Sequence, residues 1–472
     1  MLSEESKTVP RRLPARRDGR GAWACEFFSQ CSQAATDFWN SRYYFPSLLL
    51  AAAVFMLQGQ SLLGIELFGC IFAVFLLLCR DTLAACLPLF LLFLLGADYY
   101  DRIGILFSQC RWLLPLVLVA MAAHLVFNAR PWRRGKLTSS LLAVSAATLL
   151  GGLGAISKAE YWSPTALYYA FGLGPVMLLL YGALRAQLSQ SRPYNLLERF
   201  AGILYATGVF AGVVVLQVYL ERLPEFFRTF SSLDFPYRNY CATILLTALP
   251  MPCYFMKKNG RHLLGLAALY VALLMTGSRS GLVFGTGLLI VCLIYAYKRN
   301  PRFRRHNRAI LLGLLPVAAV LVLFARDLFS SRMTGGTLIS PNDSRITFFL
   351  QGIRDFQAHP LFGIGLGSME NSEIFLGVPG SIVWYHNALA QVLGSMGLLG
   401  LMAYLWQLVS RLYLLRKTAH TEAAVFGLAY GGMFLMSMTN PGEFCPFPNA
   451  FLVMLLFAVV EQVQEEMPPD TV

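Results

Sequence analysis

Charged residues are scarce in this sequence. They make up 13% of its 472 residues, whereas a soluble domain carries about a quarter. The alternation of polar and apolar residues that marks the strands of a membrane β-barrel is also missing. The ten cysteines form no CxxC pair, so neither a metal site nor a disulfide framework is indicated. Hydrophobic residues reach 57%, and this composition predicts a polytopic helical membrane protein.

Apolar runs recur from Tyr43 to the end of the chain. Each is about 17–22 residues long, which is enough to cross about 30 Å of hydrocarbon. The pattern predicts an all-α integral membrane bundle of about 12–14 transmembrane helices. The predicted spans lie near residues 44–60, 61–79, 82–98, 112–128, 137–156, 164–184, 200–219, 240–256, 261–276, 281–297, 309–325, 386–410, 421–438 and 447–463.

The net charge of +13 is better explained by membrane topology than by nucleic-acid binding, because the basic residues fall between the spans. Alternate connections are the basic ones, at 130–136, 185–199, 257–262, 298–308 and 411–417. Cytoplasmic connections are enriched in Lys and Arg, so we expect these connections and both termini to be cytoplasmic. The chain would then be a multi-pass membrane protein, with the other connections on the extracytoplasmic face.

This topology divides the chain into five parts. They are a cytoplasmic basic tail (1–43), a transmembrane bundle (44–325), a large extracytoplasmic loop (326–385), C-terminal transmembrane helices (386–464) and a cytoplasmic tail (465–472). In the first tail, an apolar pattern recurs at helical spacing through Trp23, Phe27, Cys31, Ala34 and Phe38. The spacing indicates a helix lying on the membrane surface, and an unstructured tail is the alternative.

The large loop contains a predicted amphipathic helix. Asn342, Asp343 or Ser344 would cap its start, and Pro360 would follow its end. An apolar stripe runs along it through Ile346, Phe349, Leu350, Ile353 and Phe356. We therefore expect the helix to lie on the outer leaflet or over the bundle. The glycines of GIGLGS (363–368) follow this helix, not a buried strand, so they predict a tight return toward the membrane and not a nucleotide loop.

Three polar residues lie at the predicted outer ends of helices. Arg279, in TGSRSG, stands between two apolar stretches, and a charge at the bilayer centre costs about 2.5–3.5 kcal/mol. Arg345 lies in the first turn of the loop helix, where free N–H groups and a planar guanidinium suit phosphate oxygens. His386, followed by Asn387, opens a span, and histidine suits proton transfer near neutral pH. Singly, each is more often a surface residue or polar anchor, but their convergence on one face favours a functional site.

In order, the segments TGSRSG, SRITFFLQGIRDFQAHPLFGIGLGS and HNALAQVLGSMGLLG resemble the signature of the O-antigen ligase and O-antigen polymerase superfamily. The resemblance covers about residues 235–415 and includes RNYCATILLTALP. It implies that Arg279 and Arg345 hold a lipid pyrophosphate and that His386 acts as the base. Arg238 and Asn387 are further substrate-binding candidates.

The resemblance implies a membrane glycosyltransferase of surface polysaccharide assembly, such as that of lipopolysaccharide or capsule, located in a bacterial inner membrane. Its donor would be a glycan on a polyprenyl pyrophosphate, such as undecaprenyl pyrophosphate. His386 would take the proton from an acceptor hydroxyl that attacks the anomeric carbon with inversion. The outer loops carry no DxD pair or carboxylate cluster, so we expect no metal and no other cofactor.

Two questions stay open at this point. Polymerase and ligase would share the donor chemistry and differ in the acceptor. A transporter or flippase of lipid-linked glycans is the alternative of another class, and it would predict ionisable residues at mid-membrane and broken helices. In the sequence, the notable charges lie at the outer ends of spans, which favours the enzyme.

Overall fold

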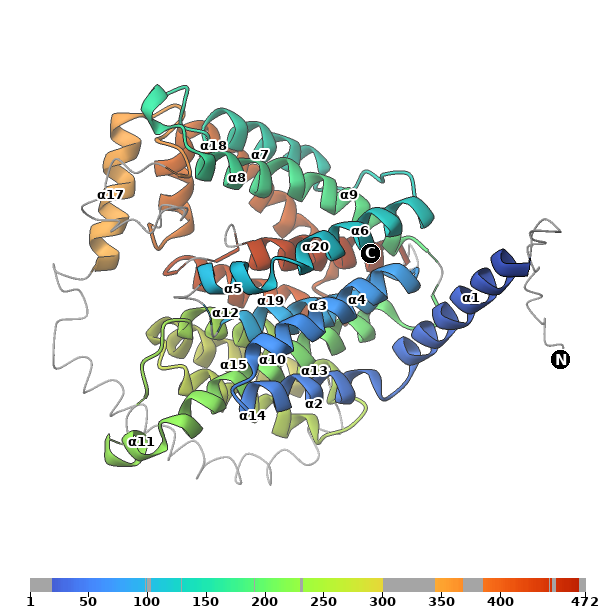
Figure 1. The fold of residues 1–472 in the computed structure, drawn as a ribbon. Helices are drawn as coiled ribbons and strands as arrows, with labels where there is room; N and C mark the ends of the chain where they lie inside the picture. The colour runs from blue at the N-terminus through green and yellow to red at the C-terminus, as the bar shows by residue number, and fades with distance from the viewer. Residues whose placement is uncertain are drawn as a thin grey trace.

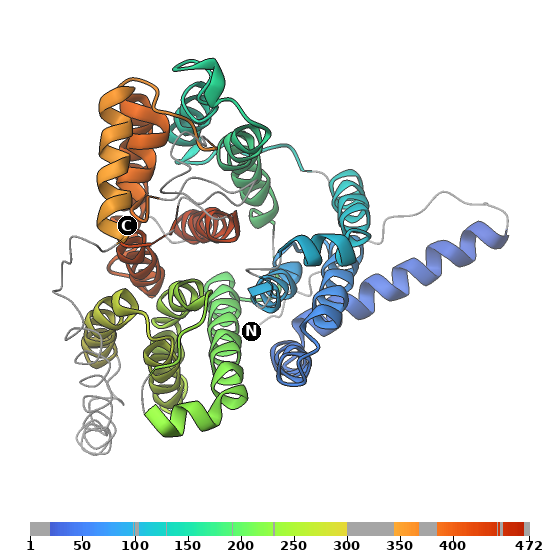
Figure 2. The same cartoon turned by 60° about the vertical axis from the view of Figure 1, so that its left-hand side comes forward.

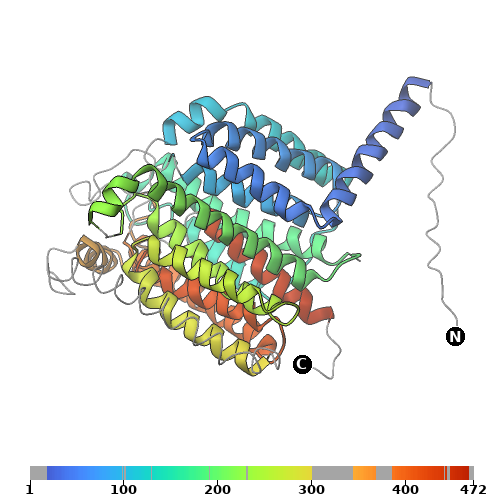
Figure 3. The ribbon, with the colours of Figure 1, turned by 90° about the horizontal axis from the view of Figure 1, so that it is seen from below.

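The computed structural model describes residues 19–97, 99, 103–128, 130–190, 192–229, 232–299, 344–367, 385–440, 442–443 and 447–466. Every regular element in these ranges is a helix, which confirms the predicted all-α class. Most helices lie side by side in one bundle, with α17 across one end and α1 projecting from the other (Figure 1). Seen from below, the long helices run in roughly the same direction (Figure 3).

The N-terminal half supplies the larger number of elements. They are α1 (Gly19–Asn40), α2 (Tyr44–Leu57), α3 (Ser61–Leu78), α4 (Leu83–Leu95), α5 (Ile103–Cys110), α6 (Leu113–Phe127), α7 (Thr138–Leu150), η2 (Ala159–Tyr161), α8 (Pro164–Phe171), η3 (Gly172–Val176), α9 (Met177–Leu188), α10 (Leu196–Glu221) and α11 (Leu223–Thr229). The elements α8, η3 and α9 form one continuous helix from Pro164 to Leu188.

The C-terminal half supplies the elements that frame the predicted site. They are α12 (Arg238–Ala248), α13 (Met251–Phe255), α14 (His262–Met275), α15 (Arg279–Arg299), α17 (Ser344–Ala358), α18 (Ala388–Thr418), α19 (Ala424–Ser437) and α20 (Phe447–Glu466). Helices occupy every predicted span within the described residues. The predicted span 309–325 and the possible cap residues Asn342 and Asp343 lie outside them.

Within the part of the chain that the structure describes, six helices are long and apolar enough to cross a membrane. Among these, α20 buries 83% of its apolar stretch and α15 only 33%, so α20 forms part of the core and α15 lies at the periphery. Six shorter apolar helices, of 10–17 residues, complete the bundle. The length and composition of these helices make the chain a membrane protein.

The basic connections gather at one end of the bundle, which we call the basic end. Lys257 forms an ion pair with Glu422 there, and Arg299 donates to the carbonyl of His420 at 2.6 Å. Arg192 pairs with Glu466 near the end of α20 at 3.2 Å. This grouping agrees with the alternation of basic connections along the sequence. The opposite end, which carries α17 and the first residues of α12 and α15, is called the site end below.

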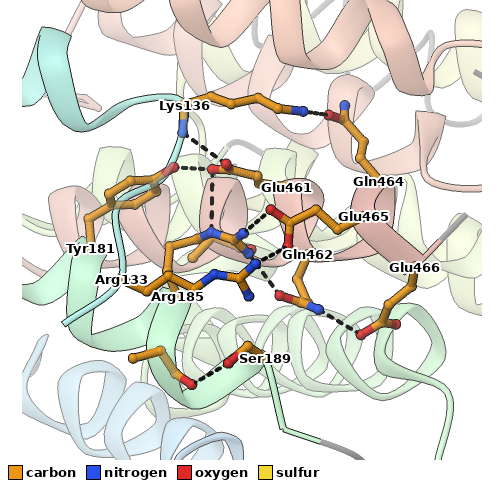
Figure 4. Close-up of polar contacts among 12 residues, drawn as sticks. Arg133, Lys136, Tyr181, Arg185, Ser189, Glu461, Gln462, Gln464, Glu465 and Glu466 are labelled. Carbon is orange, nitrogen blue, oxygen red and sulfur yellow. Dashed lines mark hydrogen bonds and ion pairs between the residues drawn. The ribbon is translucent and has the colours of Figure 1, made fainter. Parts of the chain in front are cut away.

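A buried ionic network ties the last turns of α20 to α9 at the basic end (Figure 4). The Arg185 side chain has no exposed surface and lies 3.4 Å from Glu461 and 2.6 Å from Glu465. Tyr181 donates to the same Glu461 carboxylate. Arg133, in the connection between α6 and α7, pairs with Glu465 at 3.1 Å. A buried charge is tolerated when it is paired and hydrogen-bonded, and here the partners come from α9, α20 and the connection before α7. The network therefore fixes the packing of α20 at this end.

The predicted span at 386–410 is wrong in one respect, because α18 is broken at Gly397. This glycine has φ 62° and ψ −156°, a conformation that side-chain-bearing residues rarely adopt. Beyond the break, the Leu398 N–H donates to the carbonyl of Pro360 at 2.7 Å. The residues before Gly397 pack along α17, and Figure 2 shows the two helices as an adjacent pair at one side of the bundle. Only the part of α18 after Gly397 is available to cross the bundle.

The segment that follows α17 fills this break. Ile364 and Gly365 donate their N–H groups to the carbonyls of Gly394 and Ser395, both at 2.9 Å. Leu366 donates to the carbonyl of Gly152, beyond α7, at 2.7 Å. Gly363 and Gly365 have φ values of 68° and 89°, and a Cβ at Gly365 would lie 2.9 Å from the Cα of Gly154. The glycines thus form the predicted tight return, and they let three backbone segments meet.

The sequence interpretation also misplaced one charge. Arg411 was assigned to a cytoplasmic connection, but it lies within α18 and is 3% exposed. Its guanidinium contacts Glu443 at 2.7 Å and the Tyr430 hydroxyl at 3.2 Å. Tyr430 is near the middle of α19, and Tyr404 donates to the other oxygen of Glu443. The described residues therefore contain a buried ion pair at mid-bundle, which the sequence did not predict.

Candidate functional site

Arg238 and Arg279 begin two neighbouring helices at the site end. Arg279 is the first residue of α15 and is exposed, while Arg238 is the first residue of α12 and pairs with Asp234. The two helix starts are joined because Ser278 donates its hydroxyl proton to the side-chain oxygen of Asn239 at 2.9 Å. Free N–H groups at helix starts favour anions. The geometry thus brings two of the predicted arginines to one place.

The turn before Arg279 is shaped by glycine. Gly277 has φ 63°, so a larger residue would be strained there. Thr276 and Ser278 on either side are buried, and the Ser278 hydroxyl also accepts from the N–H of Gly281 at 3.2 Å. The polar atoms of this turn are therefore bonded within the protein, and Arg279 is the member of the motif that extends outward.

Arg345 and His386 are brought together by α17. The ring of Phe348 stacks on the His386 imidazole with a centroid separation of 5.2 Å and an interplanar angle of 26°. Arg345 lies three residues before Phe348, and residues three apart share one face of a helix. The first turn of α17, with its free N–H groups, is thereby held beside the histidine. No sequence pattern indicated that Phe348 would make this connection.

His386 has an uncommon backbone conformation. Its φ of 53° is the only positive value for a residue other than glycine among the described residues. The left-handed region costs about 1–2 kcal/mol for an L-residue, and such strain clusters at functional positions. Asn387 beside it caps α18, because its side-chain oxygen accepts from the N–H groups of Leu389 and Ala390 at 2.9 and 3.0 Å.

Asn387 also connects this part of the site to α19. Its amide nitrogen donates to the carbonyl of Met438, just after α19, at 2.9 Å. Since α19 packs against both α12 and α15, the Arg345–His386 pair and the Arg238–Arg279 pair are carried by contiguous elements. The polar groups of Asn387 are largely used in this structural role, so its predicted role in substrate binding stays a prediction.

A buried polar network fixes the position of α17. Asp355 accepts from the Tyr385 hydroxyl at 2.5 Å and from Gln351 at 2.8 Å. The Tyr385 N–H donates to Gln391, whose amide donates to Ser395, and all five side chains are buried. Burial, and then the Asp355 carboxylate, raise the pKa of Tyr385 well above its ordinary value, so the hydroxyl stays a donor. The residue immediately before His386 is thus locked in place.

The apolar stripe predicted on α17 faces outward. Phe349 and Leu350 are 40% and 46% exposed, whereas Gly352 and Asp355 face α18. The helix is held by its polar and glycine side, so its apolar side is free to contact lipid. An apolar face of this kind is typical of interfacial helices, and the position of α17, on the outer leaflet or over the bundle, stays a prediction.

Asn440 is a polar residue at the site end that sequence reasoning missed. It is 1% exposed, and within the described residues neither its amide nitrogen nor its amide oxygen has a hydrogen-bond partner. It lies two residues after Met438, whose carbonyl binds Asn387. Buried amides are nearly always bonded, so this side chain is a candidate ligand-binding group. The only sequence signal was its place in TNPGE, between two apolar runs.

The described residues contain no group of three or more His, Cys, Asp or Glu side chains arranged to hold a metal ion. Among the described residues, the site end offers guanidinium groups, helix starts, one imidazole and amides. Guanidinium groups and helix starts bind phosphate, and an imidazole can accept a proton near neutral pH.

One comparison with known proteins finds a match to part of the chain. A family model described as O-antigen ligase matches residues 264–405, a range that contains Arg279, Arg345, His386 and Asn387 but not Arg238 or Asn440. A search of curated proteins finds no match. The family implies a lipid-linked glycan substrate and a glycan acceptor in the membrane. Over residues 264–405 the chain is therefore similar to the O-antigen ligase family, and this match supports a membrane protein with a glycan-transferring, ligase-like role.

Proposed function

We propose that the chain transfers a glycan from a polyprenyl-pyrophosphate donor to an acceptor hydroxyl at the extracytoplasmic face of the membrane. The observation that carries this proposal is the stacking of Phe348 on His386, which holds the first turn of α17, with Arg345, beside the imidazole. The positive-inside rule supports the orientation, because the basic end would then face the cytoplasm.

In this proposal the arginines act on the leaving group. Arg279 and Arg345, with Arg238 in support, bind the pyrophosphate and stabilise the charge that grows on it as the glycosidic bond breaks. Fixed cationic donors at a membrane surface are effective because they need little reorganisation during the reaction. Arginine suits this role better than lysine, since its planar fork matches two phosphate oxygens.

His386 acts as the general base. It accepts the proton of the acceptor hydroxyl as that oxygen forms a bond to the anomeric carbon, on the side opposite the departing pyrophosphate. The product is inverted at this carbon, and the second product is the free polyprenyl pyrophosphate. The buried Asn440 amide, two residues beyond Met438, is a further candidate for contact with a sugar hydroxyl, because binding would supply the hydrogen bonds that it lacks within the described residues.

A substitution series at His386 tests the proposal. With lipid-linked oligosaccharide as donor, His386→Ala and His386→Gln should lower turnover by about 10²–10⁴-fold and leave donor binding intact. His420→Ala is the matched control, because His420 is exposed at the basic end and only its backbone carbonyl is bound, by Arg299. Arg279→Lys should weaken both donor binding and turnover. Near wild-type turnover in a well-expressed His386→Ala protein would refute the base assignment.

The same assay separates polymerase from ligase. A ladder of products of increasing length indicates a polymerase, whereas one transfer to a distinct acceptor, such as a lipid-linked core glycan, indicates a ligase. Both outcomes leave the roles of the arginines and His386 unchanged.

A transporter of lipid-linked glycans is the second candidate, and two observations favour it. Arg411 and Glu443 form a buried ion pair at mid-bundle, and α18 is broken at Gly397. Against it, the Arg185 network joins α9 to α20 across the basic end, where a transport path would have to open. Proteoliposomes loaded with lipid-linked glycan distinguish the two candidates, since a transporter moves the glycan between leaflets without forming a new glycosidic bond.

A further inference from the structure

A cavity lies at the basic end, far along the bundle from the site described above. It has a volume of about 860 Å³ and is formed by α2, α10, α13 and α14. We call it the basic-end groove and define it by six of its lining residues, Arg42, Phe45, Arg199, Val209, Phe255 and His262.

The groove changes from polar to apolar along its length. Arg42 and Arg199 lie near the start of α2 and α10, at the basic end, whereas Val209 lies deeper in the bundle. Ten residues of helix, from 199 to 209, rise about 15 Å, which is half of a hydrocarbon core of about 30 Å. The groove therefore spans the depth of one leaflet, with its polar part at the membrane surface.

The polar part carries two arginines, Arg42 and Arg199. Arg42 is exposed and is held at the surface by its 2.7 Å hydrogen bond to the Tyr43 hydroxyl. Arg199 lies over the Trp39 ring at 4.1 Å, and its Nε is buried with no hydrogen-bond partner among the described residues. The one carboxylate that lines the groove, Glu198, is already bound by Lys258 at 2.6 Å. The arrangement suits a phosphate group.

The apolar part suits an acyl chain. Phe45 and Phe255 form its walls, and α10 presents Gly202 there, where a Cβ would lie 3.0 Å from the Phe45 ring. Val209, at the far end, is 39% exposed, so the groove is open toward the surrounding membrane at this depth. A soluble phosphate compound would leave these apolar walls uncovered.

We propose that the basic-end groove is a binding site for one anionic glycerophospholipid, such as phosphatidylglycerol, from the leaflet at the basic end. The phosphate binds Arg42 and the part of the Arg199 guanidinium that lines the groove, and one acyl chain follows Phe45 toward Val209. Basic residues at a membrane surface attract anionic lipids, and the groove adds a defined position for the chain. This site is separate from the proposed reaction and does not depend on it.

The test uses the full-length protein in detergent and native mass spectrometry with added lipid. Wild-type protein should bind one phosphatidylglycerol more tightly than phosphatidylcholine. Arg42→Gln should weaken phosphatidylglycerol binding by about fivefold, the effect of one basic residue at an anionic surface. Arg261→Gln is the matched control, because Arg261 is exposed at the same end and lies outside the lining of the groove. Val209→Trp, which fills the apolar part, should weaken binding of both lipids.

Three results would overturn the proposal. The first is equal affinity of wild-type protein for the two lipids. The second is an equal effect of Arg42→Gln and Arg261→Gln, which would indicate general surface attraction. The third is displacement of phosphatidylglycerol by millimolar inorganic phosphate, which would make the polar part a site for free phosphate. Retention of one phosphatidylglycerol in phosphate buffer, with the losses predicted for Arg42→Gln and Val209→Trp, would support it.

Discussion

The buried pair of Arg411 and Glu443 allows a quantitative prediction. Glu443 is 1% exposed, and its two oxygens accept from Tyr404 and Arg411. Glu443→Gln preserves the shape of the side chain but replaces one acceptor oxygen with a donor, so the Arg411 charge stays buried without its counter-ion. Removing one partner of a buried pair costs about 3–5 kcal/mol, and we expect a loss of this size in the free energy of unfolding.

A second substitution tests whether the charge is the cause. Arg411→Met removes the orphaned cation, and a buried ion pair replaced by apolar groups is often neutral or even stabilising. The double variant Arg411→Met/Glu443→Gln should therefore be more stable than Glu443→Gln alone by about 2 kcal/mol or more. The free energies would be measured by reversible unfolding in mixed micelles. A Glu443→Gln protein within about 1 kcal/mol of wild type, or a double variant no more stable than the single one, would refute the reasoning.

The remaining predictions concern the glycine return and the absence of a metal requirement. Gly363→Ala should greatly reduce the yield of folded protein, because Gly363 has φ 68° and a Cβ there would collide with the backbone of Ser395 and Met396. Gly260→Ala is its control, since no heavy atom lies within 4 Å of the added Cβ, and it should behave as wild type in size-exclusion chromatography. Chelators should leave transfer activity intact, and loss of activity in EDTA that Mg²⁺ or Mn²⁺ restores would overturn the proposal that arginines alone bind the pyrophosphate.

Much of the bundle could be predicted because a membrane imposes one simple requirement on length and polarity. Backbone groups in hydrocarbon must be bonded internally, so apolar runs such as 200–219 and 447–463 could only be helices, and α10 and α20 cover them. The break at Gly397 was invisible because QVLGSMGLLG contains no proline and no charged residue. Whether a glycine adopts a positive φ depends on the segments that pack against it. Here the segment that packs against Gly397 follows α17 in the chain.

The candidate site was predictable in its residues and not in its assembly. Arg345 and His386 stood out because charged and titratable groups are rare beside apolar runs, and chain order alone placed them on one face. Their contact through Phe348 depends on the packing of α17, whose outward apolar stripe gave no indication of it. Arg411 was misinterpreted for a related reason. A basic residue near the end of an apolar run looks like a cytoplasmic marker unless its partner, Glu443, is known to fold inward.

The tight return formed by the glycines after α17, at residues 363–367, has a consequence for chimeric proteins. Leu366 binds the backbone at Gly152, and the Ser157 hydroxyl binds the carbonyl of Gly363 at 2.5 Å. Gly152 and Ser157 both lie outside the family-matched range 264–405. The matched domain is therefore not a portable module, because its folding depends on a surface supplied by the half of the chain that the family match does not cover. Exchange of donor or acceptor specificity between relatives should succeed only when the turn after α7 is transplanted together with residues 344–397.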